Sequence, residues 1–299
     1  RGWAKEAGFT AAVVSASSLA PYLADGSLSG VPRFMDLVDV DSQKWRDFAA
    51  AARGPKRWLY RLEAARVQKL ERGLPTWTEA VAVVSRAEAD VFDAFTHAGA
   101  ATVAANGVDL DYFRPQTVPV EPALVFVGAM DYLPNVDGAV CFAREVWPAI
   151  RAKHPRAEFR VVGRKPAPEV QRLADLPGVK VLGTVPDVRP FVASAAAAVV
   201  PLRLARGIQN KVLEALAMAR PVVAAPPALA ALGTVPGEHL LRAASPAEWV
   251  EACSGLLADP ARGDELGAAG RRYVEAHHRW DTCLEPFLDK VIPAHAAVP

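Results

Sequence analysis

A lysine and a glutamate stand three residues apart after a glycine turn in the stretch ARGIQNKVLEALAMARPVVAA, residues 205–225. The stretch has the pattern of a loop that leads into a helix between two apolar strands. Asn210 is a good residue to cap this helix, and the free amide groups at a helix N-terminus attract anions. Lys211 adds a formal positive charge, and Glu214 lies on the same helical face. These groups could bind a diphosphate and, through the carboxylate, the hydroxyl pair of a ribose.

The same stretch also has a purely structural interpretation. Gly207 would then serve only the turn, and Glu214 would complement the helix dipole, an effect of about 0.3–1 kcal/mol. The local pattern by itself leaves both interpretations open.

Composition limits the classes of function. The chain has 299 residues, enough for two domains, and it is 52% hydrophobic and 22% charged, as in ordinary globular proteins. A net charge of +1 predicts no nucleic-acid partner. The three cysteines are widely spaced, which indicates reduced thiols, no metal site and a cytoplasmic location. Because the chain begins with Arg1 rather than Met, we expect upstream sequence to be missing.

Short apolar runs alternate with segments of helical period, the pattern of parallel α/β sheets. We expect strands at residues 11–17, 33–40, 80–85, 101–106, 123–130, 157–164, 179–185, 196–202 and 220–226. We expect helices at residues 57–73, 85–95, 135–155 and 168–177, a brief one at 187–195, and a mostly helical tail from 246 to 292. Ser85 and Asn135 are the predicted caps of two of these helices. Residues 106–123 contain an Asn-Gly turn and several prolines and are predicted to be a linker.

Several motifs follow in order along the second block. They are LVFVGAMDYLPNVDGAVCF at 124–142, FRVVGRKP at 159–166, VKVLGTVPDVRPFVASAAAAVVPL at 179–202, the stretch at 205–225, and RRYVEAHHRWD at 271–281. This ordered set resembles the donor domain of retaining glycosyltransferases of family 4 (group 1), which have the two-domain GT-B fold, and it is similar to bacterial exopolysaccharide sugar transferases. The similarity covers most of residues 106–290.

The resemblance implies an α/β fold with two Rossmann-like, doubly wound domains, and we expect the N-terminal one to be incomplete. The implied domains are residues 1–115 on the acceptor side, 116–280 for the nucleotide-sugar donor, and a C-terminal helix, 281–299, that returns to the first domain. The implied activity transfers a sugar, with retention, from a nucleotide diphosphate to a carbohydrate or lipid-linked acceptor, without a metal or other cofactor.

Site residues are carried over position by position. Glu214 falls on the second glutamate of the family signature, which binds the ribose, and Arg206 stands where the first glutamate is usual. The first loop, GAMDYLPN at 128–135, has no basic residue for the diphosphate, so Arg164, Arg203 or Arg206 would have to assist Lys211. Catalytic roles are assigned to Lys211, Arg206 and Glu214. The predicted donor-binding set is Gly128, Asn135, Arg164, Val185, Asp187, Arg203, Gly207, Ile208, Gln209, Asn210, Lys211 and Glu214.

Two features of the first block concern the acceptor. Asp39, Asp41 and Ser42 follow a predicted strand and could bind acceptor hydroxyl groups or assist proton transfer, although a loop that caps the next helix explains them equally well. Residues 55–72 combine basic and aromatic side chains and could contact the inner face of a membrane, but a solvated basic face has the same pattern.

Two alternatives to the enzyme come from other classes. The missing first glutamate and first-loop base also suit an inactive nucleotide-binding or regulatory remnant of the same fold. A dinucleotide oxidoreductase is disfavoured, because no glycine fingerprint follows an early strand.

Overall fold

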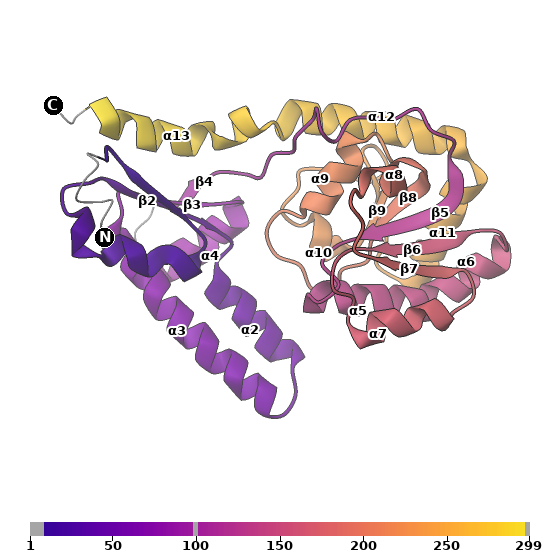
Figure 1. Cartoon of the computed structure of the whole chain (residues 1–299), viewed down its shortest axis with the longest axis horizontal. Helices are drawn as coiled ribbons and strands as arrows, with labels where there is room; N and C mark the ends of the chain where they lie inside the picture. Colours follow the sequence, from indigo (N-terminus) through magenta and orange to yellow (C-terminus); the bar gives the residue numbers. More distant parts are fainter. Residues whose placement is uncertain (1–8, 98–100, 297–299) are drawn as a thin grey trace. The chain divides into compact units, whose positions relative to one another are not determined.

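The computed structural model describes residues 9–97 and 101–296, and the chain divides into two compact units (Figure 1). The first unit comprises Arg1–Asn106 and Asp281–Pro299, and the second comprises Gly107–Trp280. The second unit therefore begins earlier than the predicted boundary at 115/116, because the Val108 amide donates to the His278 carbonyl and Arg271 donates to the Phe113 carbonyl.

The first unit is built on a parallel sheet with strand order β1-β2-β3-β4. Its strands are β1 (Ala12–Ser15), β2 (Arg33–Val38), β3 (Ala80–Val83) and β4 (Thr102–Val103). Its helices are η1 (Ser17–Ala24), η2 (Gly26–Leu28), α2 (Asp41–Ala51), α3 (Pro55–Trp77), α4 (Arg86–Thr96) and α13 (Trp280–Ala296). Helix α13 belongs to this unit from Asp281 on, whereas Trp280 belongs to the second unit.

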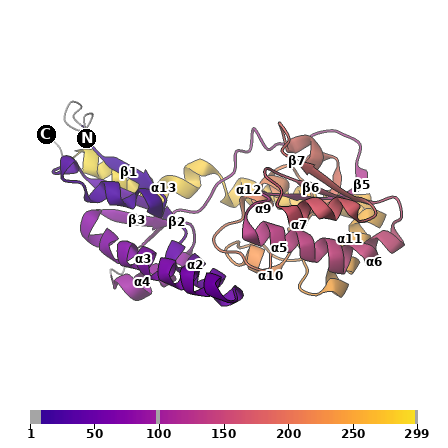
Figure 2. The ribbon, with the colours of Figure 1, turned by 60° about the horizontal axis from the view of Figure 1, so that its bottom comes forward.

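Alternation along the strands gives this sheet two apolar faces. Met35 and Leu37 pack with Leu74 of α3 and Phe92 of α4. On the other face, Phe34 contacts Phe287 of α13 edge to face, with ring centroids 6.3 Å apart. Helix α13 thus closes the second face of a sheet formed by residues far earlier in the chain (Figure 2).

The second unit is built on a parallel sheet with strand order β10-β9-β8-β5-β6-β7. Its strands are β5 (Glu121–Val127), β6 (Glu158–Val162), β7 (Val179–Gly183), β8 (Ala195–Val200), β9 (Val222–Ala224) and β10 (Leu241–Arg242). Its helices are α5 (Leu133–Cys141), the π-segment η3 (Phe142–Val146), α6 (Trp147–Lys153), α7 (Pro168–Gln171), η4 (Arg172–Asp175), α8 (Arg189–Ala193), α9 (Asn210–Ala217), α10 (Pro226–Leu229), α11 (Pro246–Ala258) and α12 (Pro260–His277).

This strand order is that of a doubly wound fold. The chain builds β5, β6 and β7 in one direction and then returns to add β8, β9 and β10 on the other side of β5. The order reverses between β5 and β8, and ligands bind such sheets outside the carboxyl ends of the strands at this point. The predicted α/β class with Rossmann-like units is confirmed.

Two predicted helix caps are wrong. Helix α5 begins at Leu133 with Tyr132 as its cap, so Asn135 lies inside the first turn. Helix α9 begins at Asn210 itself, and Gln209 is the residue before it, with no side-chain cap. Both asparagines therefore lie within their helices and not at the cap positions, and from there their side chains can face neighbouring elements. The predicted cap at Ser85 is confirmed, since its hydroxyl accepts a hydrogen bond from the Glu88 amide.

Candidate functional site

Two glycines bring the carboxyl ends of β5 and β6 together. The Gly128 amide donates to the Val162 carbonyl at 3.0 Å. A Cβ atom on Gly163 would lie only 1.6 Å from the Gly128 carbonyl oxygen, and Gly163 has a φ of +151°. Any side chain at Gly163 would therefore push apart the two strand ends that form the floor of the site.

Lys211 lies in the first turn of α9, opposite these strand ends. Its Nζ donates to Oδ1 of Asn135 at 2.7 Å and lies 5.4 Å from the centroid of the Phe126 ring. Asn135 is itself buried, and its Nδ2 donates to the Ala129 carbonyl at 2.9 Å. These bonds fix the orientation of the asparagine amide and aim the ammonium group at the loop that follows β5.

Burial shapes the charges of Lys211 and Glu214. Desolvation lowers the pKa of Lys211 to about 8, while the Glu214 carboxylate acts in the opposite direction. Desolvation also raises the pKa of Glu214, and Lys211 opposes that shift. Both side chains line one small pocket of about 10 Å³, room for about one water molecule, together with Phe113, Val188 and other apolar residues. The pocket therefore contains a buried cation and a potential hydrogen-bond acceptor in surroundings that carry little other charge.

The loop before α9 takes the shape that its glycine allows. Gly207 has a φ of +58°, a left-handed conformation that favours glycine, and Ile208 is buried beside it. The Gln209 side-chain amide donates to the Arg206 carbonyl at 2.8 Å. Gln209 provides no side-chain cap for α9, and the Val212 amide donates to the Gln209 carbonyl at 2.8 Å.

The three candidate arginine helpers differ in what they contact. Arg203 forms a bidentate ion pair with Asp137 of α5, with Nε and Oδ2 2.8 Å apart, and this pair raises the pKa of the arginine. Arg203 would have to leave Asp137 to bind a phosphate. Arg164 is exposed just beyond β6, where its carbonyl accepts from the Met130 amide. Arg206 is a residue of the loop that precedes α9.

The loop after β7 is tied to the segment that joins the units. Asp187 accepts from the Arg189 amide at 2.9 Å and pairs with its guanidinium at 2.8–3.0 Å, which lowers the pKa of Asp187. Arg189 also donates to the Tyr112 carbonyl at 3.1 Å and lies 3.8 Å over the Tyr112 ring. The Asp187 side chain is thus engaged within its own loop, and Val185 precedes it half-buried.

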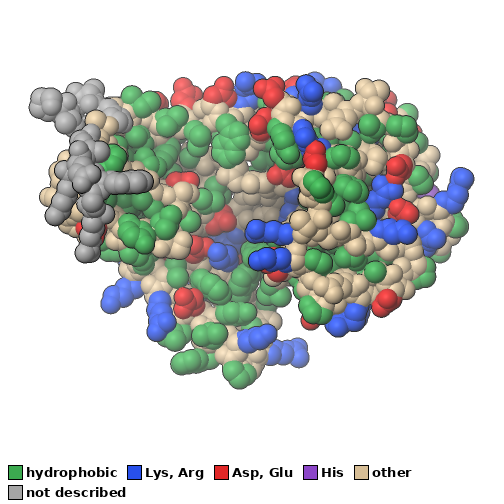
Figure 3. Space-filling view, in the orientation of Figure 1, with side chains coloured by type: hydrophobic (Ala, Val, Ile, Leu, Met, Phe, Trp, Pro, Cys, Tyr) green, Lys and Arg blue, Asp and Glu red, His purple; other side chains and the backbone are tan. Residues whose placement is uncertain are grey.

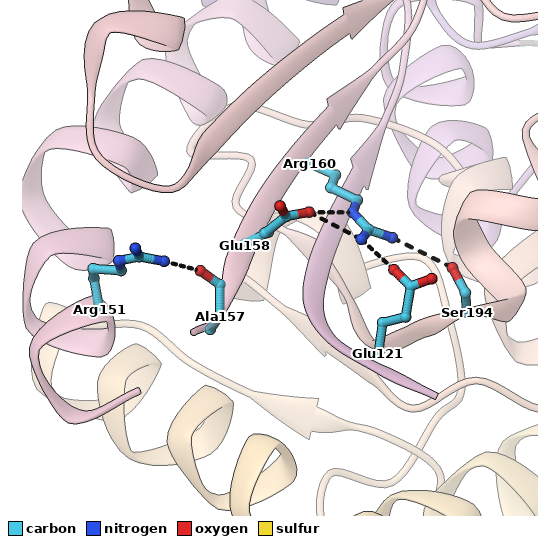
Figure 4. A network of polar contacts seen from close by, with 6 residues as sticks. All are labelled: Glu121, Arg151, Ala157, Glu158, Arg160 and Ser194. Atoms are coloured by element: carbon cyan, nitrogen blue, oxygen red, sulfur yellow. Dashed lines mark hydrogen bonds and ion pairs between the residues drawn. The ribbon is translucent and has the colours of Figure 1, made fainter. Parts of the chain in front are cut away.

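A second charged network lies at the amino ends of the strands. Arg160 of β6 pairs with Glu121 and Glu158, and its guanidinium also donates to the Ser194 hydroxyl (Figure 4). Arg151 donates nearby to the Ala157 carbonyl. Because these groups lie at the end of the sheet opposite Gly128 and Lys211, we interpret this network as structural.

Asp39, Asp41 and Ser42 lie together where β2 leads into α2. Asp41 accepts from the Ser17 hydroxyl and from Nζ of Lys44, so it already has two partners. Ser42 is buried. Val38, just before them, has a φ of +67°, which is costly for a β-branched residue and occurs most often at functional sites.

Two buried glutamates that the sequence analysis did not assign hold this turn. Glu71 accepts from the Ser42 amide at 3.0 Å, and Glu88 accepts from the Val40 amide at 2.8 Å. Burial raises the pKa of Glu71 to about 6. One sequence signal was present: Glu71 falls on the helical face of Ala64 and Leu74, which are both buried.

Over residues 9–97 and 101–296, no group of three or more His, Cys, Asp or Glu side chains is placed to hold a metal ion. Among the same described residues, no helix is both long and apolar enough to cross a bilayer.

Part of the second unit matches a known family. Residues 121–259 match the family described as glycosyl transferases group 1. No curated protein sequence matches the chain.

Solved structures resemble the chain at low sequence identity. Sucrose-phosphate synthase from Thermosynechococcus elongatus is 19% identical with a TM-score of 0.78, over 99% of this chain and 76% of that one. Anabaena HepE in complex with UDP-glucose is 13% identical with a TM-score of 0.73, over 94% and 78%. A mutant of S. aureus TarM in complex with UDP and other ligands is 13% identical with a TM-score of 0.73, over 93% and 55%. The chain thus spans about half the length of TarM. It has the α/β architecture of GT-B glycosyltransferases, and residues 121–259 match the glycosyltransferase group 1 family.

Proposed function

We propose that the protein is a retaining hexosyltransferase of family 4 that uses a nucleotide diphosphate sugar. The acceptor is a carbohydrate or a lipid-linked saccharide, in exopolysaccharide or cell-envelope glycan synthesis. The observation that carries the proposal is the buried Lys211, held by Asn135 and paired in one pocket with Glu214 at the point where the strand order reverses.

The proposed chemistry follows from these charges. When the bond between sugar and diphosphate breaks, negative charge grows on the leaving phosphate, and a preorganised cation in a site of low polarity stabilises it. Lys211 provides this cation, and the first amide groups of α9 add the partial positive charge of a helix N-terminus. Glu214 would repel phosphate, so we assign it to the ribose hydroxyl groups. Arg206, at the position of the usual first glutamate, faces the donor sugar in this proposal.

The resemblance to solved structures supports a nucleotide donor. HepE has been solved with UDP-glucose and TarM with UDP, and both have the fold seen in this chain. We infer by analogy that the donor here is a nucleotide sugar of this kind.

The acceptor side is proposed for the first unit. Asp39 and Asp41, on the turn fixed by Glu71 and Glu88, would bind acceptor hydroxyl groups. We also propose peripheral contact with the inner face of a membrane through the start of α3, because Trp58 and Leu59 are 68% and 53% exposed beside Lys56 and Arg57. Hydrophobic and basic side chains are mixed at the tip formed by α2 and α3 (Figure 3).

One observation favours a second candidate function, a nucleotide-binding module without turnover. Arg206 replaces a glutamate of the family signature, and Arg203 is committed to Asp137. Transfer of sugar from any nucleotide sugar would exclude this candidate, and NMR of the product anomer would then show whether configuration is retained.

The first test is binding. We expect calorimetric titration with UDP, GDP, ADP and CDP to show selective binding of one diphosphate, and NAD, the negative control, should not bind. Lys211→Met and Glu214→Ala should each weaken binding, whereas Lys180→Met, which removes an exposed lysine from the same unit, should not. Absence of binding by the folded wild-type protein would contradict the proposal.

A further inference from the structure

One face of the sheet in the second unit is hollowed into a groove beside β6 and β7. On the other face of β6, Phe159 is fully buried and contacts the rings of Phe142 and Trp147, with centroids 4.8 and 5.9 Å away. Glu158 and Arg160, on either side of Phe159 in the strand, face the opposite way and are only half-buried. The groove above them has a volume of about 610 Å³. This volume is within the range of about 300–1,000 Å³ that is typical of small-molecule sites.

Apolar side chains form the walls of this groove. Leu182 of β7 and Val118 of the linker line it, and each of them is 39% exposed. Pro119 of the linker and Pro190 and Phe191 of α8 line it as well. The walls therefore offer one aromatic ring and several aliphatic groups, which are the surfaces that pack against the C–H groups of a ligand.

The floor of the groove is the charged network around Arg160 (Figure 4). The carboxylates of Glu121 and Glu158 hold the guanidinium, which also donates to the Ser194 hydroxyl at 3.4 Å. This pairing ties the starts of the strands together, but it does not use every polar atom. Among the described residues, Oε1 of each glutamate accepts no hydrogen bond, and one N–H of the Arg160 Nη1 has no acceptor. The floor therefore presents acceptors and donors side by side, in positions that are fixed before a ligand arrives.

The formal charges of the groove cancel. Glu121 and Glu158 carry two negative charges, and Arg160 and Lys180 of β7 carry two positive charges. The groove therefore has no net attraction for either an anion or a cation. A hydroxyl group is both a donor and an acceptor, so it can bond to a carboxylate oxygen and to an N–H of the same floor. These features select an uncharged molecule that has several hydroxyl groups and also C–H surfaces for the apolar walls.

We propose that this groove is a second binding site, which takes a neutral saccharide. Hydroxyl groups of the sugar bond to the floor at Glu121, Glu158 and Arg160. The C–H faces of the sugar pack on Phe191 and Leu182. The groove shares no residue with the proposed donor site, so the binding does not depend on that proposal. In a glycosyltransferase, such a site would keep a glycan chain beside the enzyme and raise its effective concentration, and this consequence alone rests on the proposed function.

The test measures saccharide binding by the full chain. The probes are the neutral trisaccharides cellotriose, maltotriose, mannotriose and chitotriose and the acidic trisaccharide trigalacturonate. Calorimetric titration of the wild type should show saturable binding of at least one neutral trisaccharide, with a Kd in the millimolar range. Because the groove carries no net charge, trigalacturonate should bind no more tightly than the neutral probe.

Variants of the walls and of the floor locate the binding. Phe191→Ala should weaken trisaccharide binding roughly tenfold, because it removes apolar surface that the sugar covers, and Leu182→Ala tests the same wall at an exposed position. Glu158→Gln keeps the shape of the floor but removes the charge that strengthens its hydrogen bonds, so it should also lose affinity. The matched controls are Val235→Ala, at a residue that is 49% exposed, and Glu169→Gln, at an exposed residue of α7. Both controls lie outside the groove and should bind like the wild type.

Each outcome has one meaning. Absence of binding of every neutral probe by the folded wild type overturns the inference and leaves the proposed donor site untouched. Equal affinity of the wild type and the folded groove variants would also overturn it, because the saccharide would then bind elsewhere. Tighter binding of trigalacturonate than of any neutral probe would overturn the assigned class of ligand. Trisaccharide binding that depends on the groove supports the inference even where the nucleotide titrations fail, and that failure would count against the proposed function alone.

Discussion

The low pKa of Lys211 predicts that nucleotide binding weakens at alkaline pH. With a pKa of about 8, the free side chain is about nine tenths protonated at pH 7 and about one tenth protonated at pH 9. A bound diphosphate favours the charged form and keeps the lysine protonated over this range. The Kd of the bound nucleoside diphosphate should therefore rise about tenfold from pH 7 to pH 9, equivalent to about 1.4 kcal/mol.

Calorimetry measures this effect in two independent ways. The Kd is determined at pH 7, 8 and 9, a range above the last phosphate ionisation near pH 6. At pH 8, half of the free lysine is deprotonated, so binding should take up about half a proton. Titrations in two buffers of different ionisation enthalpy detect this uptake directly.

Three variants test whether Lys211 causes the pH dependence of the Kd. Lys211→Arg stays charged throughout, so its Kd should be independent of pH from 7 to 9. Lys211→Met should be equally insensitive and bind more weakly by roughly thirtyfold at pH 7, since a charge-assisted hydrogen bond contributes about 2 kcal/mol. Because the Glu214 carboxylate raises the pKa of Lys211, Glu214→Gln should move the transition below pH 8.

The reasoning has a clear point of failure. A wild-type Kd that changes less than about twofold between pH 7 and 9, with no proton uptake, would show that Lys211 is not the group that meets the phosphate.

Two further predictions concern stability. Gly163→Ala should lower the free energy of unfolding by about 3 kcal/mol and abolish nucleotide binding, because the new Cβ would collide with the Gly128 carbonyl. Gly183 has a φ of +67° and open space around it, so the control Gly183→Ala should lower the free energy of unfolding by only about 1 kcal/mol in thermal melts. Burial raises the pKa of Glu71 from 4.5 to about 6, so this carboxyl binds protons more tightly when folded, and its contribution to stability is present below pH 4.5 and lost as pH rises through 6. Urea unfolding should therefore show that Glu71→Gln gains about 2 kcal/mol relative to the wild type between pH 4.5 and pH 7.5, and an unchanged difference would contradict the assigned burial.

The sequence by itself was sufficient for the α/β class and for the positions of most elements of the second unit. Apolar runs such as those of β5 and β8 carry no alternation, and a parallel sheet covered on both faces is the structure that buries them. Gly207, Lys211 and Glu214 could be selected without coordinates, because a turn, a helix start and their spacing are local properties of the chain. The cap at Ser85, with Glu88 three residues later, was also predicted correctly.

Only the tertiary structure decided which groups meet. Asn135 was predicted to cap its helix, but the fold brings it to Lys211 from 76 residues away, and the ion pair of Arg203 with Asp137 joins residues 66 positions apart. The roles of Glu71 and Glu88 depend on neighbours supplied by other elements. Their local patterns are those of two ordinary helices. Hydrophobic period and turn chemistry act over a few residues, whereas burial and the pKa values that follow from it depend on how distant strands and helices pack.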